Sequence, residues 1–387
     1  MIDHLEQLTG NDMYEFKEET RALVDLVRRI VKDHQAPLET RILRGEKLSR
    51  EDYEPGRAAA REAGLWGLRL PRELSRVHLS LVDRLAVFEE NYKCLAPIHF
   101  GGEVHHALFH LQGEQKARYL DPLLTDAKRY CFALTEPGGG ADPARSVSTS
   151  ARRDGDTWII NGAKSWVSFF DDTDGVLVFA RTSKEKSAKD ISMFVVEKDN
   201  PGLIARPVPM LGGYMTHELT LENCRVDDVA FIGGEGAGFK VAQQQLSRAR
   251  FELGAKALGI AQRSYDMMVD YAKKRVVFES PLSEKQAIQS MIVDSWIEIQ
   301  QQRLMLYTCA EKDDRGDDTR MEAGMIKMTS AEMVDRVVDR AVQIHGAAGC
   351  TYESPLAHWY DLQRMSRIYD GPNETHKYRV LARRLLA

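Results

Sequence analysis

The spacing of hydrophobic and polar residues changes twice along this chain and divides it into three zones. From about Phe16 to Leu124, apolar residues recur every three or four positions, as in FKEETRALVDLVRRIV, which predicts helices that each bury one face. From Gly238 onward the same period returns in three very long pieces. Helices of about 30 residues span about 45 Å, so these pieces predict an extended helical bundle.

The zone between them, from Tyr130 to about Val229, shows alternation and short β-branched runs bounded by Gly, Asp and Asn, such as GVLVFARTS and ISMFVVEK. No helical segment of useful length separates these runs, which favours an antiparallel sandwich or barrel over a parallel nucleotide-binding sheet. We therefore expect an α+β protein with an N-terminal α-helical domain over residues 1–128, a middle antiparallel β-domain over 129–236 and a C-terminal α-helical domain over 237–387.

Composition and charge narrow the class of protein further. The chain has 387 residues, 43% of them hydrophobic, and a formal net charge of −5 with basic residues spread throughout, which is not typical of a protein that binds nucleic acid or an anionic membrane. Its five cysteines are odd in number and lack CxxC spacing, which argues against a disulfide framework or a metal site. The N-terminus resembles neither a signal nor a transit peptide, and no run of 18 apolar residues occurs, so we expect a soluble cytoplasmic protein.

Two motifs in the β zone suggest a ligand. In CFALTEPGGGADP, three consecutive glycines would let the backbone approach a ligand closely, and Thr135 offers a hydroxyl; the alternative is a flexible loop. In INGAKSWVSF, Asn161-Gly162 predicts a hairpin turn, after which Lys164, Trp166 and Ser168 would share one face. Trp166 could then cover an aromatic ring, although plain packing is the alternative.

The helical zones offer scattered polar candidates and one isolated acid. Arg250, on a helix among apolar positions, is a candidate, with a solvated or interface residue as the alternative. His345 in QIHGAAGC is a candidate base, and the alternative is a histidine that caps helix carbonyls. No HExxH, GxSxG or GxxxxGK[ST] motif and no paired carboxylates occur, which leaves Asp370 in RIYDGPNETH as the candidate acid or base.

Taken together in this order, the α, β, α zones and the motifs TEPGGGAD, NGAKSW, YAKKRVVF, QIHGAAG and IYDG resemble the acyl-CoA dehydrogenase family, from about Phe16 to Leu386. The resemblance implies an N-terminal helical domain, a middle β-domain and a C-terminal four-helix bundle, assembled as a homotetramer with bound FAD. It also implies an acyl-CoA substrate and an electron-transferring flavoprotein as the electron acceptor.

The resemblance assigns roles to individual positions. Those implied to contact FAD are Phe132, Leu134, Thr135, Gly140, Ala141, Trp166, Ser168, Arg275, Phe278, Gln286, Gln343, Gly346, Ala347 and Glu374. Of these, the six from Arg275 to Ala347 match positions that reach the FAD of a neighbouring subunit. Those implied to lie beside the acyl chain and pantetheine are Ala141, Ser247, Arg250, Tyr369 and Gly371.

By the same resemblance, Asp370 is the base that removes the α-proton of the thioester while the β-hydrogen leaves as hydride to flavin N5. Most of the family has glutamate there, and a carboxylate about 1 Å out of place can lose on the order of 10²-fold in rate. A second base position used by some relatives holds Ala249 here. Either this chain belongs to a subgroup that natively uses aspartate, or it performs β-elimination or flavin-dependent oxygenation, or it binds acyl-CoA without turnover. His105 and His106 are hypothetical contacts for a polar substituent on the acyl chain.

Overall fold

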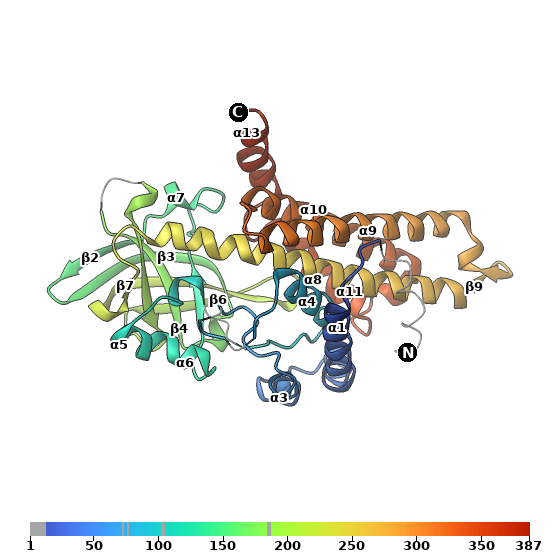
Figure 1. The fold of residues 1–387 in the computed structure, drawn as a ribbon, viewed down its shortest axis with the longest axis horizontal. Coiled ribbons are helices and arrows are strands. Elements are labelled where there is room, and N and C mark those ends of the chain that lie inside the picture. The colour runs from blue at the N-terminus through green and yellow to red at the C-terminus, as the bar shows by residue number, and fades with distance from the viewer. Residues whose placement is uncertain (1–12, 72, 76, 102–104, 184–186) are drawn as a thin grey trace. The chain divides into compact units, whose positions relative to one another are not determined.

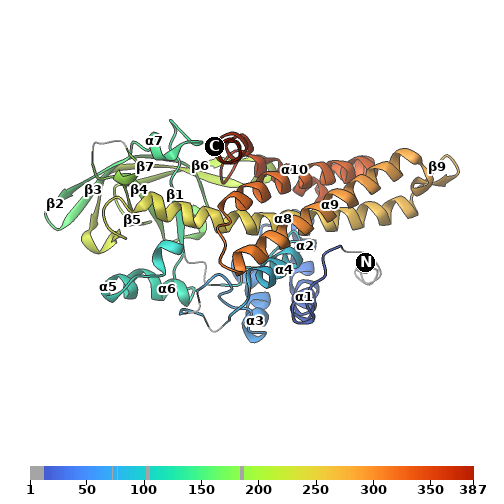
Figure 2. The same cartoon turned by 45° about the horizontal axis from the view of Figure 1, so that its top comes forward.

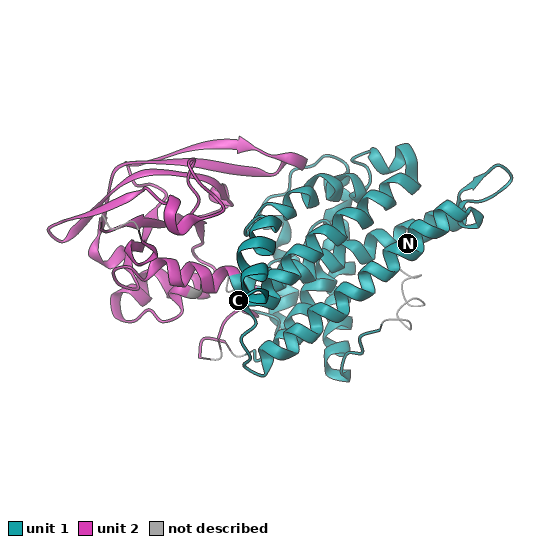
Figure 3. Ribbon diagram, turned by 90° about the horizontal axis from the view of Figure 1, so that it is seen from above, with its two compact units in different colours: residues 1–66, 77–100, 247–387 teal, residues 67–76, 101–246 magenta. Residues whose placement is uncertain are grey.

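The computed structural model shown in Figure 1 describes residues 13–71, 73–75, 77–101, 105–183 and 187–387. The chain forms two compact units, coloured separately in Figure 3. Unit 1 comprises residues 1–66, 77–100 and 247–387, and unit 2 comprises residues 67–76 and 101–246. Most of the N-terminal helical zone therefore packs with the C-terminal zone in unit 1, whereas its residues 67–76 and 101–124 belong to unit 2. Residues 1–12 of the expected N-terminal domain lie outside the described part.

Unit 1 contains the helices that the three- and four-residue period predicts. In the N-terminal zone these are α1 (Glu18–Ile30), α2 (Ala36–Leu43), α3 (Glu54–Glu62) and α4 (Leu81–Asn91). In the C-terminal zone they are α8 (Gly238–Lys274), which begins in unit 2, then α9 (Gln286–Asp314), α10 (Arg320–His345), α11 (Pro355–Arg364), α12 (Asn373–Thr375) and α13 (Ala382–Leu385). The three long helices run side by side, as Figures 1 and 2 both show.

Buried charges join the two helical zones of unit 1. The carboxylate of Glu89 on α4 accepts hydrogen bonds from Arg303 Nη2 at 2.7 Å and from Tyr307 Oη at 2.6 Å, both on α9. At the other end of α4, the carboxylate of Asp314 accepts from the Leu81 N–H at 2.6 Å, where a helix start leaves its N–H groups free. These contacts fix α4 against the C-terminal bundle.

Unit 2 is built on one eight-stranded sheet in the order β6-β7-β3-β2-β4-β5-β8, with β1 paired to β4. Its strands are β1 (Tyr130–Ala133), β2 (Ser150–Asp154), β3 (Thr157–Ser168), β4 (Gly175–Arg181), β5 (Ile191–Glu197), β6 (Leu203–Pro209), β7 (Met215–Asp227) and β8 (Phe231–Ile232). The short helices of this unit are α5 (Gly113–Gln115), α6 (Asp121–Leu124) and α7 (Pro143–Ser146). Every residue of β4 is buried, as its continuous apolar run predicts.

The sheet is mainly antiparallel, as expected, but it is not purely so. Strands β1 and β4 pair in parallel from Tyr130 opposite Gly175 to Ala133 opposite Val178, and β2 meets β4 in parallel at Ser150 opposite Arg181. The long connection that carries β2 and β3 lets the chain return to β4 in the same direction as β1. Alternation within single strands does not contain this information.

The hairpin expected at Asn161-Gly162 is wrong, because β3 runs straight through both residues. The turn falls earlier, where Asp154 pairs with Thr157 around Gly155 and Asp156. Gly162 is instead needed for close packing, because a Cβ there would lie 2.4 Å from Thr149 Oγ1.

Candidate active site

Asp370 lies on a tight turn between α11 and α12 whose backbone is left-handed at two successive residues. The φ angle is 55° at Asp370 and 95° at Gly371. Aspartate is one of the few non-glycine side chains that tolerate this region, and glycine favours it. Gly371 is also tightly enclosed, since a Cβ there would lie 2.8 Å from His376 Nε2. The turn therefore holds the aspartate in a conformation that the neighbouring residues determine.

Three side chains from different helical segments hold the backbone of this turn. The Asp370 carbonyl accepts two hydrogen bonds of 3.4 Å from Arg250 on α8, and it lies 3.1 Å from His376 Nε2. Lys327 on α10 donates to the Gly371 carbonyl at 2.7 Å and to Asn373 Oδ1 at 2.9 Å. These contacts connect the turn to both long helices.

His376 acts here as a neutral donor. Burial and the charge of Arg250 lower the pKa of His376 to about 4, so the ring is uncharged at neutral pH. Because the Asp370 carbonyl can only accept, the proton sits on Nε2. Within the described residues Nδ1 is buried without a hydrogen-bond partner. The histidine therefore supports the turn and does not compete with the carboxylate as a base.

The carboxylate of Asp370 sits among positive charges yet is more basic than an ordinary aspartate. Burial raises the pKa of Asp370, and the nearby carboxylate of Glu252 adds to this. Arg250, Lys327 and Lys256 act in the opposite direction but do not cancel the effect of burial. Such a carboxylate is suited to accept a proton at neutral pH.

Sequence reasoning found Asp370 and Arg250 but missed Lys256, Lys327 and His376. Lys327 is fully buried on α10, in the sequence MIKMTS, and a lysine surrounded by apolar residues was the only available signal. The two implied neighbours Ser247 and Tyr369 lie one helical turn before Arg250 and directly before Asp370, and both are partly accessible. Glu374 follows on α12 and is exposed.

A second group of implied cofactor residues gathers at the opposite end of the long helices. Arg275 follows α8, and Phe278 lies on the turn between β9 (Val276–Val277) and β10 (Ser280–Pro281), with 94% of its surface exposed. Figure 1 shows β9 at this end of the bundle, with α13 at the other. The remaining members are all exposed, at the start of α9 and the end of α10: Gln286, Gln343, Gly346 and Ala347.

His345 also lies at this end, and its contacts favour the capping interpretation. Its Nδ1 is 2.8 Å from the Ala341 carbonyl, and its ring stacks on Tyr271 with centroids 4.3 Å apart.

Arg250 and Arg275 are 25 positions apart on or next to one helix, which at 1.5 Å per residue separates them by roughly 37 Å. One chain's exposed tip and its Asp370 turn cannot contact the same reacting atoms.

In unit 2, a buried ion pair joins the glycine-rich segment to β3. Lys164 Nζ is 2.8 Å from Glu136 Oε1 and also donates to the carbonyl of Phe179 at 2.6 Å. Burial lowers the pKa of Lys164 to about 8. Burial alone would raise the pKa of Glu136, but Lys164 and the hydrogen bonds from Ser148 and Thr149 outweigh it and lower that pKa to about 2. Nothing in the spacing of Glu136 and Lys164 along the sequence predicts that these two charges meet.

This ion pair places the two motifs of the β zone side by side. The Ser165 N–H donates to the Thr135 carbonyl at 2.9 Å. Trp166 follows at a φ of 60°, where the register of β3 against β7 shifts between Lys164 and Val167. The expected common face is therefore wrong: Lys164 is fully buried while 52% of Trp166 is exposed, because the bulge turns Trp166 outward.

The other implied residues of unit 2 line the same region. Leu134 is buried, and the Phe132 ring packs 4.7 Å from that of Phe179 and 5.7 Å from that of His105. Gly140 lies beside Thr135, whose methyl group would be 3.9 Å from a Cβ added at Gly140. Ala141 is exposed and Ser168 is partly accessible. The side chain of His106, named with His105 as a hypothetical substrate contact, lies outside the described structure.

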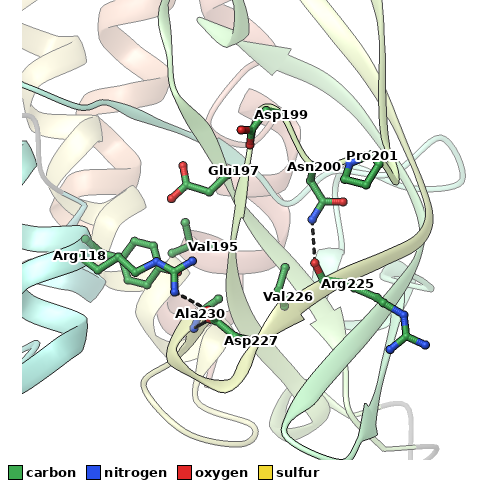
Figure 4. A pocket seen from close by; sticks show the side chains of 11 residues that line it. Arg118, Val195, Glu197, Asp199, Asn200, Pro201, Arg225, Val226, Asp227 and Ala230 are labelled. Carbon is green, nitrogen blue, oxygen red and sulfur yellow. Dashed lines mark hydrogen bonds and ion pairs between the residues drawn. The ribbon is translucent and has the colours of Figure 1, made fainter.

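The pocket drawn in Figure 4 is a different feature of unit 2. It has a volume of about 370 Å³ and is lined by polar and apolar residues of β5, β7, the loop after β5 and the segment at Arg118 and Tyr119, together with Ala230. Arg118 pairs there with Asp227, and Asn200 Nδ2 donates to the Arg225 carbonyl at 2.8 Å. None of the candidate residues lines this pocket, so we assign it no part in the site.

The family models identify the class of protein. Three models match the chain in order: the N-terminal domain of acyl-CoA dehydrogenase over residues 17–127, the middle domain over 131–224 and the C-terminal domain over 236–386. The chain belongs to the acyl-CoA dehydrogenase family. Members of this family depend on FAD, and this chain is an oxidoreductase that acts on acyl-CoA.

Individual relatives resemble it over almost their whole length. The chain is 32% identical to the (R)-benzylsuccinyl-CoA dehydrogenase of Thauera aromatica, over 96% of this chain and 97% of that protein. The butyryl-CoA dehydrogenase of Megasphaera elsdenii superposes with a TM-score of 0.84 at 25% identity, over 97% and 100% of the two chains. A chain from a structure of the electron transferring flavoprotein of Acidaminococcus fermentans gives a TM-score of 0.85 at 29% identity, over 96% and 99%.

The residues of unit 2 fit a flat, polar-edged cofactor such as FAD. Trp166 exposes half of a large aromatic surface at a left-handed backbone position, which suits it to cover the face of a flat ring. The partly accessible Thr135 and the exposed Gly138 and Gly140 supply a hydroxyl and open backbone close by. Within the described residues, no helix is both long and apolar enough to span a membrane.

Proposed function

We propose that this protein catalyses the α,β-dehydrogenation of an acyl-CoA thioester to the 2-enoyl-CoA, with Asp370 as the base that removes the α-proton. The observation that carries the proposal is the Asp370 turn. Its backbone is held by Arg250, Lys327 and His376, while burial raises the pKa of its carboxylate. FAD, when bound, supplies the acceptor for the β-hydride.

The chain's own residues then have distinct tasks in the proposed reaction. Asp370 takes the α-proton, and its backbone N–H donates to the thioester oxygen as negative charge develops there. Arg250 and Lys327 keep the turn in place, so the shorter side chain of aspartate is aimed by the backbone and not by its own reach. Ser247, Tyr369 and Gly371 border the acyl chain and pantetheine.

We further propose that two chains complete each cofactor site. Thr135, Trp166 and their neighbours would contact the flavin of their own chain. The exposed tip around Phe278 and the ends of α9 and α10 lie roughly 37 Å from Arg250 along α8, so we propose that they contact the FAD of another chain. A homotetramer that passes electrons to an electron-transferring flavoprotein fits this arrangement. The five free thiols of each chain are typical of a protein in a reducing compartment such as the cytoplasm.

The test is anaerobic mixing of the FAD-loaded protein with straight, branched and aromatic acyl-CoAs while the flavin absorption band is followed. We expect at least one class to bleach the band in the wild type and not in Asp370→Asn. Asp33→Asn, which changes an exposed aspartate on the first helical segment, is the matched control and should bleach normally. Retained flavin and an unchanged melting temperature would show that Asp370→Asn folds.

Three results would contradict the proposal. Normal bleaching by Asp370→Asn would remove Asp370 from the reaction. Absence of bleaching by every thioester, with FAD bound, would favour elimination or acyl-CoA binding without turnover. Thioester-dependent oxygen consumption would favour flavin-dependent oxygenation.

A further inference from the structure

Lys256 is a cation near Asp370 that does not help to hold the turn in place. It lies on α8, six residues after Arg250, and its ammonium is 5.5 Å from the centre of the Tyr92 ring, directly after α4. It is close enough to Asp370 for the two charges to interact. Unlike Arg250 and Lys327, however, it makes no hydrogen bond to the backbone of the turn.

The position of Lys256 is fixed by close packing of α8 on α4. Three residues further along α8, Gly259 lies so near α4 that a Cβ there would be 2.2 Å from the Glu89 carbonyl oxygen. The same Cβ would be 3.1 Å from the backbone of Tyr92. Because the two helices approach this closely here, the lysine one turn earlier lies beside Tyr92.

The charge of Lys256 is poorly compensated. Among the described residues, no carboxylate lies within ion-pair distance of its ammonium, and it forms no hydrogen bond to the protein. Apart from its contact with the Tyr92 ring, its three N–H donors find no acceptor among the described residues. Three cations, Arg250, Lys256 and Lys327, act on the Asp370 carboxylate, and Glu252 is a second acid nearby. A partly buried cation without an anionic partner favours a ligand that supplies the anion.

We propose that Lys256 binds a carboxylate carried by the acyl group, so that the substrates are CoA monothioesters of dicarboxylic acids. This inference rests on the proposed function, since it requires the acyl chain to lie beside Asp370. The Asp370 carboxylate and the Lys256 ammonium then contact two ends of one short substrate. The ammonium donates to the substrate carboxylate while Tyr92 covers its other side.

The experiment compares thioesters that differ only in charge. The CoA monothioesters of succinic, glutaric and adipic acid are paired with their methyl esters and primary amides. Dissociation constants are measured by the shift of the flavin spectrum with FAD-loaded Asp370→Asn, which does not turn substrate over in the proposed reaction. Values of kcat/KM are measured with FAD-loaded protein that retains Asp370. Each measurement is repeated after Lys256→Gln, Lys256→Arg and Lys274→Gln.

We expect the acid of the best chain length to bind at least about 10-fold more tightly than its ester when Lys256 is present. Lys256→Gln should reduce this acid-to-ester ratio of affinities about 10- to 100-fold. The lost charge also acts on Asp370, but that effect changes the turnover of acid and ester alike and cancels in the ratio. Lys256→Arg, which keeps the charge, should retain part of the preference. Lys274→Gln, which removes an exposed lysine of the same helix, should retain all of it.

Two outcomes would overturn the inference. One is equal affinity for acids and esters at every chain length in protein that retains Lys256. The other is an equal loss for acids and esters in Lys256→Gln, together with a shift in the pH profile, which would mean that the lysine acts only through Asp370. Failure of the proposed function looks different: no thioester, charged or uncharged, would bleach the flavin, while the acid preference in binding could still be measured.

Discussion

Replacement of Gly371 by alanine tests whether the turn itself positions Asp370. The added Cβ meets two obstacles: a φ of 95°, and the His376 ring at 2.8 Å. A left-handed non-glycine residue costs about 1–2 kcal/mol. Overpacking a tight site typically costs a further 1–3 kcal/mol, so the total should be about 2–5 kcal/mol.

The ring of His376 has little room to yield. On its other side, a Cβ added at Gly324 of α10 would lie 3.3 Å from Nδ1, so the histidine is held between α10 and the turn. We therefore expect the turn to move instead, with loss of the contact between Nε2 and the Asp370 carbonyl. A displacement of about 1 Å at the carboxylate should reduce kcat on the order of 10²-fold.

The matched control is Gly45→Ala, because Gly45 has a φ of 82° and no atom within 4 Å of the added Cβ. It should show the backbone cost alone, about 1–2 kcal/mol, with normal turnover. Both variants are compared by urea unfolding and by the rate of flavin bleaching. The double variant Gly371→Ala/His376→Ala should recover part of the stability by removing the clash. Equal stability and equal turnover in Gly371→Ala and Gly45→Ala would refute the argument.

Four further predictions concern charged groups. Because the base must be ionised, kcat should rise with pH through a midpoint above the ordinary aspartate value of 3.8, since burial raises the pKa of Asp370; a midpoint at or below 3.8 would contradict this. Lys164→Met should destabilise the protein by about 3–5 kcal/mol in urea unfolding and weaken flavin retention, because it leaves Glu136 buried without its partner. The pKa of Glu136 lies near 2 when folded and 4.5 ordinarily, so its contribution to stability is complete above about pH 4.5 and is lost as the pH falls toward 2; Glu136→Gln should remove this dependence. Arg303→Met should cost about 3–5 kcal/mol by leaving Glu89 unpaired, and an unchanged urea midpoint would show that the pair contributes nothing.

Much of the fold could be predicted because helical and strand periods are local properties. The long helices α8, α9 and α10 and the fully buried β4 follow directly from them. The prediction of a turn at Asn161-Gly162 was wrong because this dipeptide also suits close backbone packing within a strand. Only the position of Thr149 in the folded chain decides between a turn and close packing. The parallel pairing of β1 with β4 depends on residues about 45 positions apart and leaves no local trace.

The residues of the candidate site likewise divide into those that a local motif predicts and those that only the folded chain brings together. Asp370 could be found because its sequence motif is local, and its tight turn was apparent from the adjoining glycine. The lysines around it could not, because Lys256 and Lys327 lie more than 40 positions before it and look like ordinary helix residues. Their importance comes from what burial does to a charge, and burial is a property of the folded chain.

The exposed tip at Phe278 has a genetic consequence in an oligomer whose sites are shared between chains. A chain altered at the tip would damage the site of its neighbour and keep its own base, whereas a chain altered at Asp370 would do the reverse. In a mixed assembly of two such inactive chains, some sites would be built from both altered parts and others from two intact parts. Two inactive alleles could thus restore part of each other's activity, and natural selection would act on this hairpin through sites that lie in other molecules.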